Sequence, residues 1–407
     1  MTVSQNDLAN QTHQRRRILY IQKPSGGGST ISLYDLVKGL DRAQYEPIIL
    51  FLTNNKYRQD FNHLGIKVLA MDFSKQLESK RHRKNFFIAN IYHSWRADLP
   101  LALSVVRIIK KEKIDLVHQN LGFERAVMIA TLLTRTPQIC HFRHFIHKIP
   151  LTIKALLSSV NAALYTTKAI ASQYRSLGLS VAKSSVVYEP IDIKKFSEAH
   201  NTALIRQQFA IGDNESIVSN IGRITSWKGQ HYFLEAMADI IAQYPNTKVL
   251  IVGEPGQSSK DKKYFDELQE LAQKTPLFGQ VIFTGNRNDV AEIMAASDIV
   301  VHSASKPEPF GLVIAEAMAA GVPVIATRGG GTTEIIEDNV TGLLVPMESA
   351  SGIKEAIEKL FASRELREAI SAKAHSEVTR RFSAEQHVAK VQKMYQDVFA
   401  ESLKADR

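Results

Sequence analysis

The chain has 407 residues, more than one ordinary hydrophobic core holds, so its length predicts two domains. Hydrophobic residues make up 44% and charged residues 23%, as in an average soluble protein, and no apolar run reaches the roughly 18 residues of a membrane-spanning helix. The 51 basic and 41 acidic residues leave a net charge of +10, which favours phosphorylated substrates, anionic lipid headgroups or nucleic acid as partners.

Three further features narrow the class of protein. No zinc-finger spacing and no RNP-like aromatic motif occurs, so specific nucleic-acid binding is not expected. Residues 1–14 are polar, are predicted to be disordered and lack the apolar core of an export signal. A single cysteine, Cys140, excludes an internal disulfide framework. A cytoplasmic protein is therefore expected.

The first half of the chain alternates short apolar strands with helices, which is typical of a parallel, helix-covered sheet. Strands are expected at 16–21, 47–52, 67–71, 114–118, 138–141, 162–166 and 185–188, and helices include 31–40, 101–111 and 125–133. Gly27 and Gly28 belong to a glycine cluster between the first strand and its helix, where glycine permits positive φ and close approach of a ligand. The cluster is neither G-x-G-x-x-G nor a P-loop, and a flexible turn explains it as well.

Polar side chains follow two of these strands. His118-Gln119-Asn120 ends one strand and His141-Phe142-Arg143-His144 the next. Residues just past the carboxyl ends of parallel strands face the ligand cleft, so His141 and Arg143 are candidate catalytic residues, with a structural role as the alternative. No carboxylate accompanies the histidines at ligand spacing, so no metal site is predicted.

A basic cluster, Lys80-Arg81-His82-Arg83-Lys84, precedes aromatic and aliphatic residues up to Trp95. Such a segment can lie on an anionic membrane surface. A solvated basic turn followed by an ordinary core-facing helix explains it as well.

The second half repeats the alternation. Strands are expected at 216–221, 248–253, 280–284, 298–302, 322–326 and 342–345, and the chain is helical from 349 onward, ending in a helix at 384–403. Arg223 and Lys228 lie on the loop after the first of these strands, where two cations can hold a diphosphate; an exposed basic loop is the alternative. Gly253 lies in a turn at the end of the next strand.

The connection between the strands at 298–302 and 322–326 carries the strongest signal. A helix is expected to begin near Gly311, so the N–H groups of Gly311, Leu312 and Val313 form a potential anion site. Glu308 and Glu316 frame that site and can accept hydrogen bonds from hydroxyl groups. A solvated loop acid and an acid complementing the helix dipole are the alternatives.

Three motifs resemble the retaining glycosyltransferases of family 4, which have the GT-B fold. Glu308 and Glu316 match the E-x7-E signature, including Pro-Phe-Gly and the Glu-Ala-Met-Ala-Ala-Gly-Val-Pro-Val tail. Residues 222–229 match Gly-Arg-x4-Lys-Gly, and residues 330–334 match Gly-Gly-x-x-Glu. The segment around Glu189 resembles the segment between the family's domains, although the family usually has Asn there.

The resemblance implies an α/β GT-B fold, in which two doubly wound Rossmann-like domains face each other across a cleft. The disordered residues 1–14 would precede an acceptor-side domain at 15–195 and a nucleotide-sugar-binding domain at 196–380. Residues 381–407 would form a helix that crosses back to the first domain.

It also implies roles for individual residues. Arg223 and Lys228 would contact the donor pyrophosphate, Glu308 the sugar hydroxyls and Glu316 the ribose. His141 and Arg143 would lie near the transferred sugar. The donor-binding set would be completed by Gly27, Gly28, Gly253, Phe310, Gly311, Leu312 and Val313.

The implied activity is retaining, metal-independent transfer of a hexose-type sugar. The donor would be a UDP- or GDP-linked sugar, a substrate rather than a cofactor. A glycan or lipid-linked acceptor is expected, as in lipopolysaccharide or other cell-surface polysaccharide assembly, with the protein peripheral on the inner face of the membrane. Two alternatives remain: a non-catalytic nucleotide-sugar-binding protein, and a sugar-nucleotide 2-epimerase, which lacks E-x7-E.

Overall fold

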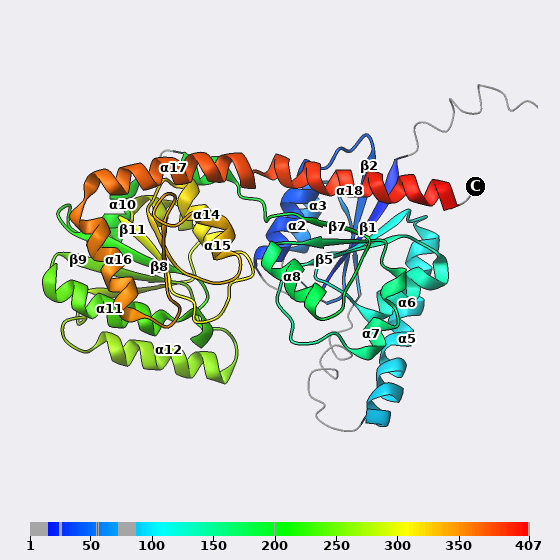
Figure 1. Ribbon diagram of the computed structural model, residues 1–407, viewed down its shortest axis with the longest axis horizontal. Helices are drawn as coiled ribbons and strands as arrows, with labels where there is room; N and C mark the ends of the chain where they lie inside the picture. Colours follow the sequence, from blue (N-terminus) through cyan, green and yellow to red (C-terminus); the bar gives the residue numbers. More distant parts are fainter. Residues whose placement is uncertain are drawn as a thin grey trace, which may run out of the picture. The chain divides into compact units, whose positions relative to one another are not determined.

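The computed structural model describes residues 15–23, 27–53, 55, 57–71, 87–198 and 200–405, without the side chains of 87–97, 152 and 402–405. The chain divides into two compact units (Figure 1). Unit 1 comprises Met1–Pro190 and Ala384–Arg407, and unit 2 comprises Ile191–Ser383; the sequence alone placed the divisions after residues 195 and 380. The expected disordered segment 1–14 and the basic cluster at 80–84 lie outside the described residues.

Unit 1 is built on a parallel sheet with the strand order β3-β2-β1-β4-β5-β6-β7. Its strands are β1 (Arg16–Gln22), β2 (Tyr45–Phe51), β3 (Lys67–Ala70), β4 (Leu116–Gln119), β5 (Gln138–Phe142), β6 (Ala162–Tyr165) and β7 (Lys183–Val186). Its helices are α2 (Gly28–Gly39), α3 (Arg58–His63), α5 (Phe87–Lys111), α6 (Arg125–Thr134), α7 (Leu151–Lys154), the short 3-10 helix η1 (Leu157–Ser159), α8 (Lys168–Ser176) and α18 (Ala384–Ala405). The expected helix at 101–111 is only the end of α5, which continues through Pro100.

Both faces of the unit 1 sheet are buried, because alternate residues of its central strands face opposite helices. Ile18 and Tyr20 of β1 pack in one cluster with residues of α2 and α18. Leu19 and Ile21 pack in another with residues of α5 and α6. The hydroxyl of Tyr395 on α18 donates to the hydroxyl of Tyr20 over 2.9 Å. Helix α18 is therefore part of the core of unit 1.

Unit 2 contains a second parallel sheet, in the order β10-β9-β8-β11-β12-β13. Its strands are β8 (Ser216–Ile221), β9 (Thr247–Val252), β10 (Val281–Gly285), β11 (Ile299–His302), β12 (Val324–Thr327) and β13 (Leu343–Val345). Its helices are α9 (Ile193–Ser197), α10 (Thr202–Gln208), the 3-10 helix η2 (Ser226–Lys228), α11 (Gln230–Gln243), α12 (Ser259–Ala272), α13 (Val290–Ala296), α14 (Leu312–Ala319), α15 (Thr332–Ile335), α16 (Ala350–Ala362) and α17 (Arg364–Phe382).

The unit 2 sheet is covered in the same way. Val218 of β8 and Val249 of β9 pack with residues of α11, α12 and α16. The neighbouring Ile217 and Leu250 pack on the opposite face with residues of α10 and α13. The two doubly wound α/β sheets that the sequence predicts are confirmed, with strand ends shifted by at most two residues.

The strand order positions the candidate ligand sites. In unit 1, β1 lies between β2 and β4, and in unit 2, β8 lies between β9 and β11. At such a switch point the connections after two neighbouring strands diverge, and ligands bind at the carboxyl ends there. Within the described residues, the helices are too short or too polar to span a bilayer.

Candidate active site

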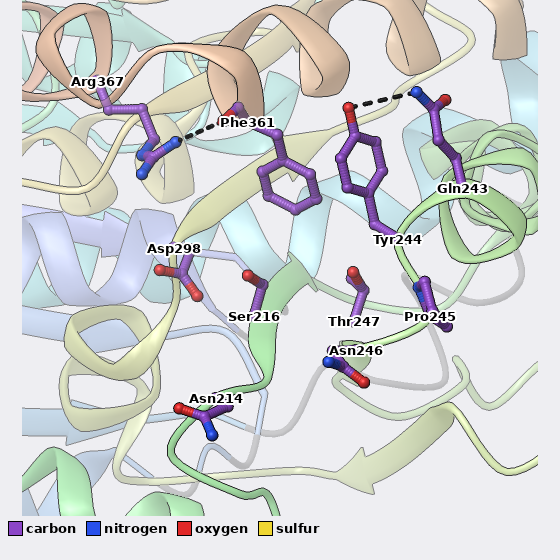
Figure 2. A pocket seen from close by; sticks show the side chains of 10 residues that line it. All are labelled: Asn214, Ser216, Gln243, Tyr244, Pro245, Asn246, Thr247, Asp298, Phe361 and Arg367. Atoms are coloured by element: carbon purple, nitrogen blue, oxygen red, sulfur yellow. Dashed lines mark hydrogen bonds between the residues drawn. The ribbon is translucent and has the colours of Figure 1, made fainter.

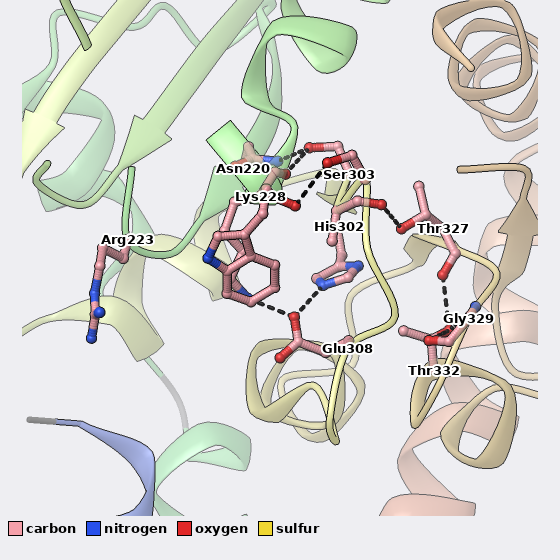
Figure 3. A network of polar contacts seen from close by, with 12 residues as sticks. Asn220, Arg223, Lys228, His302, Ser303, Glu308, Thr327, Gly329 and Thr332 are labelled. Atoms are coloured by element: carbon pink, nitrogen blue, oxygen red, sulfur yellow. Dashed lines mark hydrogen bonds and ion pairs between the residues drawn. The ribbon is translucent and has the colours of Figure 1, made fainter. Parts of the chain in front are cut away.

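Two loops meet at the switch point of the unit 2 sheet, one after β8 and one after β11 (Figure 3). The hydroxyl of Ser303 donates to the carbonyl of Lys228 over 3.0 Å, and the N–H of Ser305 donates to the carbonyl of Trp227 over 2.9 Å. Gly229 ends η2 with a φ of 67°, and a Cβ there would lie 2.1 Å from the carbonyl oxygen of Ser303. Glycine is thus required for the close approach that fixes Lys228 beside the second loop.

The polar centre at the carboxyl ends of these strands consists of Lys228, Glu308 and His302. The Nζ of Lys228 lies 2.7 Å from Oε2 of Glu308, and Nε2 of His302 lies 3.0 Å from the same oxygen. Burial alone would raise the pKa of Glu308, but the charge of Lys228 and the hydrogen bond from His302 outweigh it and lower the pKa to about 2. Glu308 is therefore an ionised, buried carboxylate at neutral pH.

The glycine loop before α15 supports the backbone of Glu308. The N–H of Gly331 donates to the carbonyl of Glu308 over 2.7 Å. Gly330 has a φ of 66°, and a Cβ there would lie 2.3 Å from that carbonyl oxygen. The hydroxyl of Thr332 closes the loop by donating to the carbonyl of Thr327 over 2.8 Å. The segment that matches Gly-Gly-x-x-Glu thus holds the loop of Glu308.

Helix α14 begins directly after this loop. Gly311 is its N-cap with a φ of 108°, and the N–H groups of Ile314 and Ala315 donate to the carbonyl of Gly311. The N–H groups of Leu312 and Val313 make no hydrogen bond with the described residues. These two donors lie at the positive end of a helix, where the sequence predicts an anion site.

Glu316 and Phe310, two other predicted site residues, lie on or next to α14. Burial raises the pKa of Glu316 to about 7, with Lys195 acting in the opposite direction. The ring of Phe310 is buried and packs edge-to-face against Phe382, with centroids 5.5 Å apart. The side chain of Phe310 is thus used for packing.

Arg223 is exposed, and its side chain points away from the carboxylate of Glu308 (Figure 3). The loop that carries it is packed closely, because a Cβ on Gly253 would lie 2.1 Å from the carbonyl oxygen of Gly222. The structure thus brings Lys228 and Glu308 into contact and leaves the guanidinium of Arg223 in solvent.

In unit 1, Arg143 is enclosed by protein partners. Its Nη1 donates to Oε2 of Glu189, its Nε to the carbonyl of Asn120 over 3.1 Å, and its Nη2 to Oδ1 of Asn120 over 3.0 Å. Nη2 also lies 3.1 Å from Nδ1 of His141. Burial and the charge of Arg143 hold the pKa of His141 well below its usual value. His141 and Arg143 are thus brought together, in a buried cluster.

Gly27 and Gly28 lie at the start of α2. Gly27 has a φ of 107°, and its carbonyl accepts from the N–H of Thr30 over 3.0 Å. The side-chain amide of Asn120 donates to the carbonyl of Ser29 over 2.9 Å and so ties this helix start to the end of β4.

Unit 2 has a hollow of about 360 Å³ at the opposite end of its strands (Figure 2). It lies at the amino ends of β8 and β9, among polar and aromatic side chains. Asp298 accepts from the N–H of Ile217 over 2.8 Å, and Arg367 donates to the carbonyl of Phe361 over 3.3 Å. Because the hollow lies at the amino ends of the strands and the candidate active site at their carboxyl ends, the two are separate.

Two residues at the centre of these networks were not identified from the sequence. Glu189 accepts from Arg143, and also from the hydroxyl of Thr166 over 3.1 Å, but the sequence showed only an acid where the family usually has Asn. His302 ends a predicted strand. His141 was selected because residues at the carboxyl ends of parallel strands face the ligand cleft, and the same reasoning could have found His302.

Two family models match the chain. "Glycosyl transferases group 1" matches residues 201–377, and "Glycosyltransferase Family 4" matches residues 26–195. Among solved structures, HepE of Anabaena in complex with UDP and glucose has a TM-score of 0.78 at 22% identity, covering 94% of this chain and 100% of that one. A glycosyltransferase from Rickettsia africae has a TM-score of 0.81 at 22% identity, covering 95% and 99%. These two likenesses show the fold.

Curated relatives include N-acetyl-alpha-D-glucosaminyl L-malate synthase of Bacillus anthracis, 25% identical over 74% of this chain and 79% of that protein. The lipopolysaccharide core biosynthesis glycosyltransferase LpsE of Rhizobium meliloti is 33% identical over 42% of this chain and 46% of its own length. An Escherichia coli UDP-Gal:alpha-D-GlcNAc-diphosphoundecaprenol alpha-1,3-galactosyltransferase is 25% identical over 74% and 80%. The match to LpsE thus spans about half of that relative's length.

The two family models together match most of both units, and they agree with the strand order and with the motifs around Lys228 and Glu308. The chain therefore belongs to glycosyltransferase family 4, the group 1 glycosyl transferases with the GT-B fold.

Proposed function

We propose that this glycosyltransferase moves a hexose-type sugar, with retention of configuration, from a nucleotide-diphosphate sugar to an acceptor hydroxyl. UDP is the expected nucleotide, because the Escherichia coli relative is named for UDP-Gal and HepE of Anabaena was solved with UDP. Relatives named for lipopolysaccharide core biosynthesis and for diphosphoundecaprenol support the proposal of a glycan or lipid-linked acceptor. The protein would then be peripheral on the inner face of the membrane. The basic cluster at 80–84 would favour such a surface.

The observation that supports this proposal best is the pairing of Lys228 with Glu308 immediately before the start of α14. The ammonium of Lys228 has three N–H donors, so it can hold Glu308 and still donate to a phosphate oxygen. The N–H groups of Leu312 and Val313 can receive the same diphosphate. Arg223, exposed on the neighbouring loop, adds a second cation.

The chemical step follows from these charges. The bond between the anomeric carbon and the diphosphate oxygen breaks, and Lys228, Arg223 and the helix start stabilise the negative charge of the departing diphosphate. The acceptor oxygen bonds to the anomeric carbon on the face that the diphosphate leaves. The acceptor proton passes to an oxygen of the leaving phosphate, so no protein nucleophile is required. Because protein groups supply the positive charge, we expect transfer without a divalent metal.

A thermal-shift screen with UDP-, GDP- and ADP-sugars in the presence of EDTA tests the donor site. The expected result is stabilisation of the wild-type chain by a UDP-sugar, because a ligand at 100 times its dissociation constant adds about 2.7 kcal/mol to the native state. Lys228→Ala and Glu316→Ala should lose this shift. Lys306→Ala is the matched control, since Lys306 is exposed on the loop of Glu308 and is not among the hydrogen-bond or ion-pair partners of Glu308 and Lys228.

Retention is tested by following the anomeric proton of the product by NMR when a diphosphoundecaprenol-type acceptor is supplied. An α-linked donor should give an α-linked product. Inversion at the anomeric carbon would contradict the front-face step, and stabilisation by UDP-sugars that survives in Lys228→Ala would contradict the assigned donor site.

A further inference from the structure

His302 is the last residue of β11, and its side chain is only 5% exposed. Its Nε2 lies 3.0 Å from Oε2 of Glu308, whose carboxyl group is ionised at neutral pH. An ionised carboxylate only accepts hydrogen bonds. Nε2 of His302 therefore carries a proton and donates it to Glu308.

The second imidazole nitrogen shows that packing alone does not explain a histidine here. Nδ1 of His302 is buried and has no hydrogen-bond partner within the part of the chain that the structure describes. A buried polar atom without a partner costs free energy. The other residues of β11, Ile299, Val300 and Val301, are apolar and avoid that cost.

The two donors to Glu308 converge on one carboxylate oxygen (Figure 3). Nζ of Lys228 and Nε2 of His302 both contact Oε2, which has two lone-pair directions, while Oε1 makes no hydrogen bond with the described residues. The lysine stem is flexible, whereas the imidazole is fixed by the strand beneath it. The histidine therefore defines the orientation of the carboxylate and leaves Oε1 for a ligand.

We propose that His302 is a positioning residue of the donor-sugar site: it holds Oε2 of Glu308, so that Oε1 accepts a hydrogen bond from a hydroxyl of the transferred sugar. This inference rests on the proposed function, since it takes the sugar of a nucleotide sugar as the ligand of Glu308. His302 should therefore affect only the binding of the sugar moiety, because the nucleoside diphosphate is held by other groups.

The test compares the affinities of UDP and UDP-glucose by calorimetry in the wild type and its variants. His302→Phe keeps a ring but removes the N–H, and His302→Gln places an amide N–H where Nε2 stood. The gain in affinity from UDP to UDP-glucose should be about tenfold smaller in His302→Phe than in the wild type. The affinity of this variant for UDP alone should stay within about twofold of wild type. His302→Gln should keep that gain within about threefold. If His302→Phe folds poorly, His302→Asn replaces it in the test. Its side chain is too short to reach Oε2, so it should show the same loss of sugar-dependent affinity.

The matched control is His200→Phe, because His200 also faces a glutamate, Glu292 at 4.0 Å, and has a buried Nε2 without a described partner. It should leave both affinities unchanged. If Glu308→Ala removes the sugar-dependent gain while His302→Phe and His302→Asn retain it, the inference is overturned and the proposed function stands. If the wild type binds neither UDP nor UDP-glucose, the proposed UDP-sugar donor is overturned, and the inference with it.

Discussion

Glu308 and Glu316 belong to the same loop-and-helix connection, yet their environments shift their pKa values in opposite directions. Lys228 and His302 outweigh burial at Glu308 and hold its pKa near 2. At Glu316 burial outweighs the opposing charge of Lys195 and raises the pKa to about 7. The first is a permanent acceptor at neutral pH, whereas the second is partly protonated and can also donate.

The raised pKa of Glu316 predicts a stability change with pH. Its carboxyl group titrates near 4.5 in the unfolded chain and near 7 in the folded one. The folded state therefore binds the proton more tightly, and ionisation costs stability as pH rises from about 4.5 to 7, by at most about 3 kcal/mol. Glu316→Gln should match wild type at pH 4 and be more stable at pH 8.

Chemical denaturation across that pH range measures the difference. Glu355→Gln, an exposed acid on α16, is the control and should run parallel to wild type. A constant difference between Glu316→Gln and wild type from pH 4 to pH 8 would contradict the assigned cause.

The hydrogen-bond partners of a buried side chain were harder to predict than the position of that side chain in the fold. The strand-end rule placed Arg143 correctly beside the carboxyl edge of β5, but its partner Glu189 is 46 positions away. The hydrogen bonds of Ser32 and Thr166 to that same carboxylate join four separate segments. Such a network depends on tertiary packing, which residue type and spacing do not encode.

At the scale of elements, the strands were predictable because each is a short β-branched or apolar run that ends in polar or glycine residues. The helix at 101–111 was predicted too short, because α5 begins at Phe87 and contains Pro100, a residue type that usually interrupts a helix. The structure carries α5 through that proline, and its apolar residues Leu101 and Val105 pack against β1 and β2.

The contact between η2 and the loop after β11 predicts a large effect of Gly229→Ala. A Cβ would lie 2.1 Å from the carbonyl oxygen of Ser303, and φ is 67°. The positive φ alone costs about 1–2 kcal/mol, and the steric clash must also displace Lys228 from Glu308. We expect lower thermal stability and at least a tenfold loss of UDP affinity.

Gly279→Ala is the control that separates the strain of a positive φ from the steric clash with Ser303. Gly279 has a φ of 75°, but a Cβ there meets nothing within 4 Å. It should lose a similar amount of stability from strain and keep its affinity for UDP. Equal UDP affinities of the two variants would show that the loop contact does not position Lys228.

At the scale of the whole molecule, unit 1 is discontinuous in sequence and unit 2 is not. Helix α18 supplies buried apolar side chains to unit 1: Val388, Val391, Met394, Tyr395 and Val398. At about 2 kcal/mol for each such side chain, removing them costs about 10 kcal/mol, which is comparable with the whole stability of a domain.

Deletion of residues 384–407 should therefore unfold unit 1 and leave unit 2 folded. Hydrogen exchange should show loss of protection in β1 and β4, and retention in β8 and β11. The isolated segment 191–383 should melt cooperatively and keep its affinity for UDP. Protection of β1 in the truncated chain would contradict this account.

The position of α18 also sets an order of events during protein synthesis. The 193 residues of Ile191–Ser383 are made between the two parts of unit 1. At about 5–20 residues per second, the apolar surface of β1 and α2 waits roughly 10–40 s on the ribosome for its covering helix. The unit whose synthesis starts first is thus completed last.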